Sequence, residues 1–379
     1  MLYREAGQFK TTYSQDMAMF PIRQDRIALV LLLAFAFVGV PLLAKFHIWP
    51  FGSEYMLRAI LVPFLILSLA AVGVNILVGY CGQISLGSGA FMAVGAYSAY
   101  KFGTGIHIPL ALLGFNISIP PLPVLPSILL GGLMAALVGI LFGVPSLRIK
   151  GLYLAVATLA AQFFCDWVFL RVPWFTNYSS SGSVNAPALD FFGLLMNSPT
   201  ERYFVCLTFV AVFALLAKNL VRGNIGRQWM AIRDMDIAAE LMGIRLLRTK
   251  LLAFAVSSYY CGVAGAMMVF LWYGGAEYDV FNINQSFFIL FMVIIGGLGS
   301  LIGSFFGAAL IFMMPIGLGI MLPALLGPFG IAIGSETIEH LRFIIVGALI
   351  IFFLIVEPHG LARLWQIAKQ KLRVWPFPY

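Results

Sequence analysis

Several polar side chains of this chain lie within apolar stretches, where each needs a hydrogen-bond partner. An amide, hydroxyl or carboxylate in apolar surroundings requires a hydrogen bond, and a polar solute passing by can supply it. We therefore predict that a translocation pathway is lined by Asn75, Gln83, Ser85, Ser88, Thr158, Gln162, Asp166 and Ser300. Asp166 is the one carboxylate well inside an apolar run, and we expect it to face a polar cavity or a partner group.

Glycine is dense in two stretches that separate apolar runs. They are residues 79–95 (GYCGQISLGSGAFMAVG) and residues 296–307 (GGLGSLIGSFFG). Small residues four apart let membrane helices approach closely, whereas a broken helix can offer backbone dipoles to a solute. For these two stretches we favour broken helices that contact a solute. For a third set the same spacing favours close helix packing: Gly131, Ala135, Gly139 and Gly143.

A charged segment, residues 222–250, stands between two apolar runs. On a helical wheel one apolar stripe is formed by Ala231, Ile232, Met235, Ala238, Ala239 and Met242, and Gly243 is placed to end the helix. Such a surface suits the groove of a partner protein. We predict that this coupling contact uses Arg227, Arg233, Asp234, Asp236, Ala238, Ala239, Glu240 and Gly243. An ordinary helix resting on lipid is the alternative.

No arrangement suited to catalysis is recognisable in the sequence. The chain has neither a GxxxxGK[ST] nucleotide loop nor a Ser/His/Asp or Cys/His set. Glu336, Glu339 and His340 have ligand-like spacing, but their place at the start of an apolar run favours a solvated role, so we predict no metal site. The four cysteines are far apart in apolar contexts and are expected to be small core residues. We predict a chain that is not an enzyme, holds no cofactor, and depends on another chain for energy.

Composition places the chain in a membrane. Hydrophobic residues make up 61% of its 379 residues and charged residues 10%, against about 25% charged in soluble domains. We expect an all-α integral membrane protein with about ten transmembrane helices, eight at the fewest, because runs of about 20 apolar residues can each span the hydrocarbon core. The runs are 27–46, 57–78, 84–100, 126–144, 151–170, 203–220, 251–273, 286–302, 303–322 and 338–356.

Basic residues predict the orientation of the chain. Most of the 23 Lys and Arg residues lie in the N-terminal tail, the 146–150 turn, the 222–250 segment and the C-terminal tail. Cytoplasmic regions carry this excess, so both termini and the 222–250 segment are expected in the cytoplasm. The predicted organisation is a tail at 1–26, a transmembrane domain at 27–357 and a second tail at 358–379. Because the charge of +8 is dispersed over the ends of apolar runs, membrane lipid is an expected partner and nucleic acid is not.

Two longer connections fall on the opposite, external side. Residues 102–125 are rich in proline, which favours a stiff, extended excursion. Residues 172–202 combine aromatic residues with a Ser/Gly/Asn run and are expected to form a surface loop. This loop is either a platform for an external partner or a plain connector.

Several stretches, taken in order, are similar to one protein family. The sequence resembles the LivM-like permease subunits of ATP-binding-cassette importers for branched-chain amino acids. The resemblance rests on residues 79–96 (GYCGQISLGSGAFMAVGA), 147–160 (LRIKGLYLAVATLA), 226–252 (GRQWMAIRDMDIAAELMGIRLLRTKLL), 295–309 (IGGLGSLIGSFFGAA) and 357–361 (EPHGL). It implies a bacterial inner-membrane subunit that works with a second homologous permease, two ATPase subunits that bind ATP, and a periplasmic solute-binding protein.

The resemblance also implies how the charged segment works. In this class a cytoplasmic loop of the permease docks in a cleft of the ATPase, and Ala238, Ala239 and Gly243 match its signature. Ile237 stands where more distant importers have Glu, and residues 179–185 (SSSGSVN) replace a stretch that is often Gly-Gly-x-x-Gly. The same architecture serves urea and hydrophobic or aromatic acids, so these solutes stay open beside branched-chain amino acids. An ion-coupled secondary carrier and a receptor-like membrane protein are the rival functions.

Overall fold

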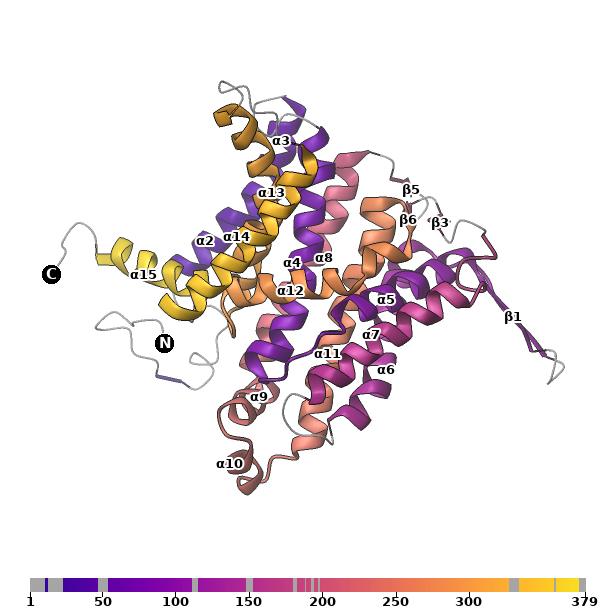
Figure 1. Ribbon diagram of the computed structural model, residues 1–379, viewed down its shortest axis with the longest axis horizontal. Coiled ribbons are helices and arrows are strands. Elements are labelled where there is room, and N and C mark those ends of the chain that lie inside the picture. Colours follow the sequence, from indigo (N-terminus) through magenta and orange to yellow (C-terminus); the bar gives the residue numbers. More distant parts are fainter. Residues whose placement is uncertain are drawn as a thin grey trace.

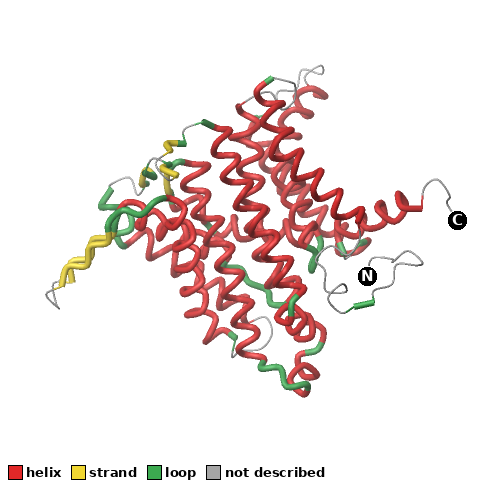
Figure 2. Tube along the Cα trace, turned by 180° about the vertical axis from the view of Figure 1, so that it is seen from behind, coloured by secondary structure: helices red, strands yellow, loops and turns green. Residues whose placement is uncertain are grey.

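The computed structural model describes residues 11–12, 23–46, 54–110, 115–147, 153–179, 183–187, 189–191, 194–196, 198–326, 334–357 and 359–374. Most of the predicted N-terminal tail therefore lies outside the described residues. The described chain is dominated by helices, with short strands gathered at one side of the bundle (Figures 1 and 2). The all-α prediction is confirmed.

The first two long helices occupy opposite environments. Arg23–Ala34 (α2), Phe35–Gly39 (η1) and Val40–Lys45 (α3) form one continuous helix whose apolar window is only 6% buried. Met56–Leu61 (η2), Val62–Asn75 (α4) and Ile76–Tyr80 (η3) form a second one that is 89% buried. Both are apolar all round, so burial is decided by neighbours: α4 packs against α8, α11, α12 and α13, whereas α2 stays at the periphery.

Small residues bring three helices of the core into close contact. Ser88–Thr104 (α5), Val124–Ser146 (α6) and Leu246–Met267 (α11), which continues as Met268–Tyr273 (η4), pack closely against one another. A Cβ on Gly131 would lie 2.5 Å from the carbonyl oxygen of Gly95, and one on Gly139 would lie 2.3 Å from Oγ of Ser258. The predicted packing role of the small residues in α6 is thus confirmed.

The remaining long helices complete the bundle. They are Tyr153–Arg171 (α7), Pro199–Arg222 (α8), Ile283–Gly296 (α12), Leu301–Leu326 (α13) and Ser335–Val356 (α14). Each of the predicted apolar runs overlaps a described helix, although the run 286–302 extends across the end of α12 into the start of α13. Among the described residues, eight helices are long and apolar enough to cross a membrane. The exact number of crossings and the orientation stay predictions.

Both Gly-dense stretches interrupt helices, as the sequence predicts. The continuous helix formed by η2, α4 and η3 ends at Tyr80. Residues 81–87 are not helical, and α5 begins only at Ser88, four residues after the predicted start. The α12 helix ends at Gly296 and α13 begins at Leu301, so the predicted boundary between residues 302 and 303 is wrong. The break comes earlier because Gly297 and Gly299 have φ values of +116° and +75°, which a continuing helix cannot contain.

The strands lie at the side of the bundle where α3 ends. Ile106–Leu110 (β1) and Phe115–Ile119 (β2) form the projecting antiparallel hairpin in Figure 2. Val184–Asn185 (β3) pairs with Gly275–Ala276 (β6), and Asp190–Phe191 (β4) pairs with Leu194–Leu195 (β5). The two predicted external connections therefore both contain strand pairs.

At the opposite side of the bundle lie Asn224–Asp234 (α9), Asp236–Leu241 (α10), the start of α2 and Gly360–Val374 (α15) (Figure 1). An ion pair between Lys369 of α15 and Asp25 of α2 joins two of these elements. The charged segment and the ends of the transmembrane domain thus share one side, as the distribution of basic residues predicts.

The close approach of α6 and α11 gives a test of the packing. A Cβ on Gly262 would lie 2.3 Å from Cβ of Ala135 and 3.1 Å from Cα of Gly132. We expect Gly262→Val to lower the free energy of unfolding by about 3 kcal/mol, since an overfilled core forces neighbours apart. Gly347→Val in α14 is the control, because a Cβ there has no neighbour within 4 Å. Thermal unfolding in detergent would show equal losses for both variants if α6 and α11 did not pack in this way.

Candidate functional site

The charged segment folds as two helices joined by one extended residue. The α9 helix ends at Asp234, Met235 has φ −157° and ψ 103°, and α10 runs from Asp236 to Leu241. Gly243, at φ +87°, ends α10, and the N–H of Ile244 bonds to the carbonyl oxygen of Ala239 over 3.1 Å. The prediction of Gly243 as the stop is confirmed. The prediction of one helix is wrong, because the turn at Met235 breaks it.

The predicted apolar stripe is also wrong. Ile232 and Ala239 are buried, whereas Met235 and Met242 are each 70% exposed. Breaking the helix at Met235 rotates α10 relative to α9, so one wheel cannot describe both. The outer surface of the segment is formed instead by four exposed apolar side chains: Met235, Ile237, Leu241 and Met242. We call them the outer apolar surface.

Two contacts anchor α9 to the bundle. Trp229 is fully buried, and its Nε1 donates a hydrogen bond to the carbonyl oxygen of Thr249 in α11 over 3.0 Å. Gly226 lies directly against α8, since a Cβ there would be 1.9 Å from the carbonyl oxygen of Val221. The segment is therefore held as a defined projection at the end of α8 and α11.

Arg233 connects this projection to both Gly-dense stretches. Its Nη1 donates a hydrogen bond to the carbonyl oxygen of Gly79 over 2.8 Å, and Nε and Nη2 donate to Oδ1 of Asp234 over 3.1 and 3.0 Å. A Cβ on Gly82 would lie 3.0 Å from Cγ of Arg233, and one on Gly299 would lie 3.1 Å from Nη1. The Arg233 side chain thus lies over the first stretch and reaches the second.

Asn75 joins the same two stretches from inside α4. Its Nδ2 donates to the carbonyl oxygen of Ser300 and to Oγ of Ser304, each over 2.8 Å, while Oδ1 accepts the N–H of Gly299 over 2.9 Å. Asn75 is fully buried. Its Oδ1 satisfies the N–H of Gly299, which the break between α12 and α13 leaves without a helical partner, and its Nδ2 adds a bond to the carbonyl oxygen of Ser300, which also accepts the N–H of Ser304 over 3.2 Å.

The two Gly-dense stretches touch at Gly79 and Gly299. A Cβ on Gly79 would lie 2.3 Å from the backbone nitrogen of Gly299 and 2.0 Å from Oδ1 of Asn75. Only a glycine at residue 79 leaves room for this contact. We call the cluster formed by Asn75, Gly79, Arg233, Gly299 and Ser300 the break junction.

A second polar cluster provides hydrogen-bond acceptors for the backbone N–H groups at the start of α5. Oγ1 of Thr158 accepts the N–H of Leu86 over 2.9 Å, and Oε1 of Gln162 accepts the N–H of Ala90 over 2.6 Å. Oγ of Ser286 accepts the N–H of Gly89 over 2.7 Å. The first N–H groups of a helix have no partner within it, and here α7 and α12 supply the acceptors.

Asp166 belongs to this second cluster. Its Oδ1 accepts a hydrogen bond from Nε2 of Gln162 over 2.9 Å, and Tyr278 is a further hydrogen-bond partner. Nε2 of Gln162 also donates to the carbonyl oxygen of Phe281 over 3.0 Å. The expected partner group of Asp166 is therefore the amide of Gln162 together with Tyr278.

Three more predicted residues lie between the clusters, in or beside residues 81–87. Ser85 and Ser88 are buried, and Oγ of Ser85 accepts the N–H of Gly87 over 3.4 Å. Gln83 is 6% exposed, and neither its Oε1 nor its Nε2 has a hydrogen-bond partner. Among the described pathway residues, Gln83 is the one whose buried polar atoms have unused hydrogen-bonding capacity.

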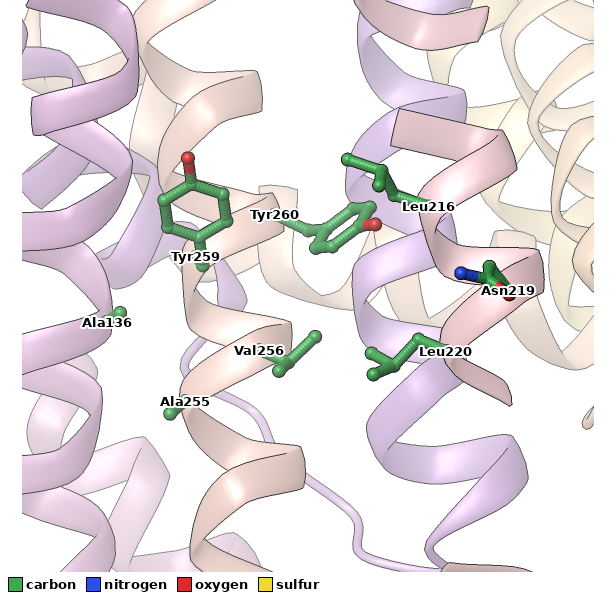
Figure 3. Close-up of a pocket in the computed structure, with 8 residues that line it drawn as sticks. All are labelled: Ala136, Leu216, Asn219, Leu220, Ala255, Val256, Tyr259 and Tyr260. Carbon is green, nitrogen blue, oxygen red and sulfur yellow. The ribbon is translucent and has the colours of Figure 1, made fainter. Parts of the chain in front are cut away.

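An open groove of about 410 Å³ lies elsewhere, between α6, α8 and α11 (Figure 3). Apart from Asn219 and two tyrosines its lining is aliphatic: Ala136, Leu216, Leu220, Ala255 and Val256. None of the predicted pathway residues lines this groove. Its apolar character does not match the polar route that those residues predict.

Sequence reasoning missed three residues that build the site. Ser286 and Ser304 are fully buried hydrogen-bond partners of the two clusters, and Trp229 anchors α9. Ser286 and Ser304 could have been recognised in the sequence, because each is a serine within an apolar run that has small residues at regular spacing. Nothing in the local sequence marks Trp229 as the buried residue of a charged segment.

The hydrogen bonds of Asn75 give a direct test of the break junction. Asn75→Leu keeps a similar size but leaves the N–H of Gly299 without its bond and removes one of the bonds to the carbonyl oxygen of Ser300. We expect it to lower the free energy of unfolding by about 2 kcal/mol or more, since each buried group left unsatisfied costs about 1–3 kcal/mol. Asn219→Leu on the exposed face of α8 is the control, with a change of about 0.5 kcal/mol or less. Equal thermal stability of the two variants would contradict the assigned role of Asn75.

Comparison with known proteins identifies the family. Residues 56–354 match the family model described as branched-chain amino acid transport system / permease component. The high-affinity branched-chain amino acid transport system permease protein LivM of Escherichia coli (strain K12) is 30% identical over 293 residues, which are 69% of this chain and 63% of the relative. LivM of Salmonella typhimurium (strain LT2) is 29% identical over 284 residues, 66% of this chain and 61% of the relative.

These matches leave part of the relatives uncovered. The chain spans less than two thirds of the length of both curated relatives. No solved structure matches it. The matched region runs from η2 to the end of α14 and so contains the break junction, the second polar cluster and the charged segment. This multi-pass membrane chain belongs to the family of permease components of branched-chain amino acid transport systems.

Proposed function

We propose that this chain is a transmembrane subunit of an ATP-binding-cassette importer in a bacterial inner membrane. It moves branched-chain or related hydrophobic amino acids from periplasm to cytoplasm together with a second, homologous permease. Two ATPase subunits bind and hydrolyse the ATP, and a periplasmic binding protein delivers the solute. The names of its relatives support the solute class, since both are permeases for branched-chain amino acids.

One observation carries the proposal: a projecting segment with an exposed apolar surface is hydrogen-bonded to one helix break of the bundle and lies against the other. The outer apolar surface is suited to a protein groove, because exposed Leu and Met side chains adapt to a partner. Behind it, Arg233 binds Gly79 and contacts Gly299. A force on the segment therefore has a direct mechanical route to the two places where the helices are interrupted.

The solute route is proposed to run along residues 81–87, beside the two polar clusters. Gln83 is the residue we assign to polar contact with the solute, because its buried amide has both donor and acceptor capacity unused. Asn75, Thr158 and Gln162 hold backbone groups at the breaks. In this proposal they keep the route open, and they touch the solute only when the breaks rearrange.

The docking part of the proposal can be tested by charging the outer apolar surface. Leu241 is 85% exposed, so Leu241→Asp should leave the fold intact while placing a carboxylate in the contact with the ATPase. We expect co-purification of the ATPase and ATP-driven uptake of leucine to fall at least tenfold, whereas Leu241→Met should retain both. Recovery of the chain with no ATPase, and uptake driven by an ion gradient without ATP, would instead establish a secondary carrier.

The transmission part is tested at Arg233. Arg233→Gln removes the charge and the full set of guanidinium donors, so we expect the ATPase to remain bound and to hydrolyse ATP while solute-stimulated hydrolysis and uptake fall about tenfold. Arg233→Lys keeps a donor for Gly79 and should recover part of the uptake. Asp234→Asn is the matched control, since it leaves the bond to Gly79 in place. Loss of ATPase binding in Arg233→Gln would assign Arg233 to docking and not to transmission.

A further inference from the structure

The C-terminal helix α15 lies beyond the region shared with the family model, which ends at residue 354. It leaves the lower end of α14 sideways instead of continuing along it (Figure 1). Gly360, at φ +66°, makes this turn possible. The helix therefore needs an explanation separate from that of the transmembrane bundle.

Three contacts fix the level of α15 relative to the membrane. At its start, a Cβ on Gly360 would lie 2.6 Å from the carbonyl oxygen of Ile295, at the end of α12. In its middle, the Trp365 ring packs at 5.6 Å from that of Phe306, near the start of α13. Further on, Lys369 pairs with Asp25, where the first apolar helix begins. All three partners lie at the ends of candidate spans, so α15 runs along one membrane surface.

The surface of α15 is divided into an apolar and a polar side. Leu364 and Trp365 are each 46% exposed and Ile367 is 37% exposed, although all three are apolar. On a helical wheel they share one half with Leu361, while Arg363, Gln366 and Gln370 lie on the other. A helix with this division lies in the plane of the interface and places its apolar side among the upper acyl chains.

The charge of α15 has one sign. Its sequence, GLARLWQIAKQKLRV, contains basic residues and no acidic residue. Arg363 pairs with Glu357 just before the helix, at 3.2 Å. Lys371 follows Ile367 by one turn on the apolar side, where its stem can follow acyl chains while the ammonium reaches the phosphates of lipid headgroups. A basic helix at this level complements an anionic lipid surface.

We propose that α15 is an interfacial helix that binds the anionic headgroup layer of the membrane, with Leu364 and Ile367 in the acyl region and Lys371 at the phosphates. The exposed apolar side favours lipid over a protein partner because it lies at the level where the spans end. This inference is independent of the transported solute and of the importer assignment.

Hydrogen–deuterium exchange of the full-length chain in nanodiscs tests the proposal. We expect the amides of α15 to exchange at least about fivefold more slowly in phosphatidylglycerol than in phosphatidylcholine, with the difference falling as salt rises. Lys371→Gln should remove most of that difference. Gln370→Glu changes the net charge by the same amount but on the polar side of α15. It should therefore retain more of the difference in exchange between the two lipids. Equal exchange in the two lipids at every salt concentration would overturn the proposal.

Quenching by brominated lipids tests the depth of the helix. The emission of Trp365 is the difference between the unmodified protein and Trp365→Phe, and we expect bromines close to the headgroups to quench it most. The emission of Trp167, on the exposed side of α7, is obtained in the same way from Trp167→Phe and should be quenched more by deeper bromines. Leu364→Gln together with Ile367→Gln should reduce the quenching of Trp365 and leave that of Trp167 unchanged. Protection of α15 that appears only when another protein is added, without quenching of Trp365, would assign this side to a protein partner and overturn the proposal.

Discussion

Unpaired backbone groups inside an apolar bundle are the constraint on which the rest of this structure depends. Hydrocarbon offers no hydrogen bonds, so a helix within a membrane bundle can be broken only where side chains replace the missing partners. Asn75 does this at the break between α12 and α13, and Thr158, Gln162 and Ser286 do it at the start of α5. The two breaks are therefore built by polar residues contributed from distant parts of the chain. Close contact at Gly79 and Gly299 then makes the breaks neighbours.

Much of the fold follows from local sequence, because span length, apolar composition and glycine spacing are local properties. The apolar runs predict the described helices, and the glycine-dense stretches predict where helices are interrupted. The small residues of α6 predict its packing. The polar residues chosen from sequence do gather at the breaks, with Asn75 beside Ser300 and Thr158 one turn from Gln162. That these residues contact the solute is still a prediction. Gln83 supports it most directly, because its buried amide has no hydrogen-bond partner.

Two features could not be predicted from local sequence: hydrogen-bond partners that are far apart in the chain, and the angle between successive helices. A helical wheel assumes one continuous helix, so it failed for residues 222–250, where one extended residue, Met235, turns α10 away from α9. The wheel consequently placed Met235 and Met242 with Ala239, although the first two are exposed and Ala239 is buried. Arg233 was expected in the contact with another subunit. That contact stays a prediction, and the bond to Gly79 adds a contact with the bundle that no local pattern indicates.

In the proposed mechanism, Arg233 makes the projecting segment and the break junction move as one body. The sharpest test of this claim is the distance between spin labels at Asn224→Cys and Leu298→Cys, after replacement of the four buried cysteines. In the assembled transporter we expect this distance to be the same with and without ATP. The distance from either label to a third label at Val156→Cys on α7 should change. With Arg233→Gln, the first distance should change too. A shift of several ångströms between Asn224 and Leu298 on ATP binding, with Arg233 in place, would contradict the claim.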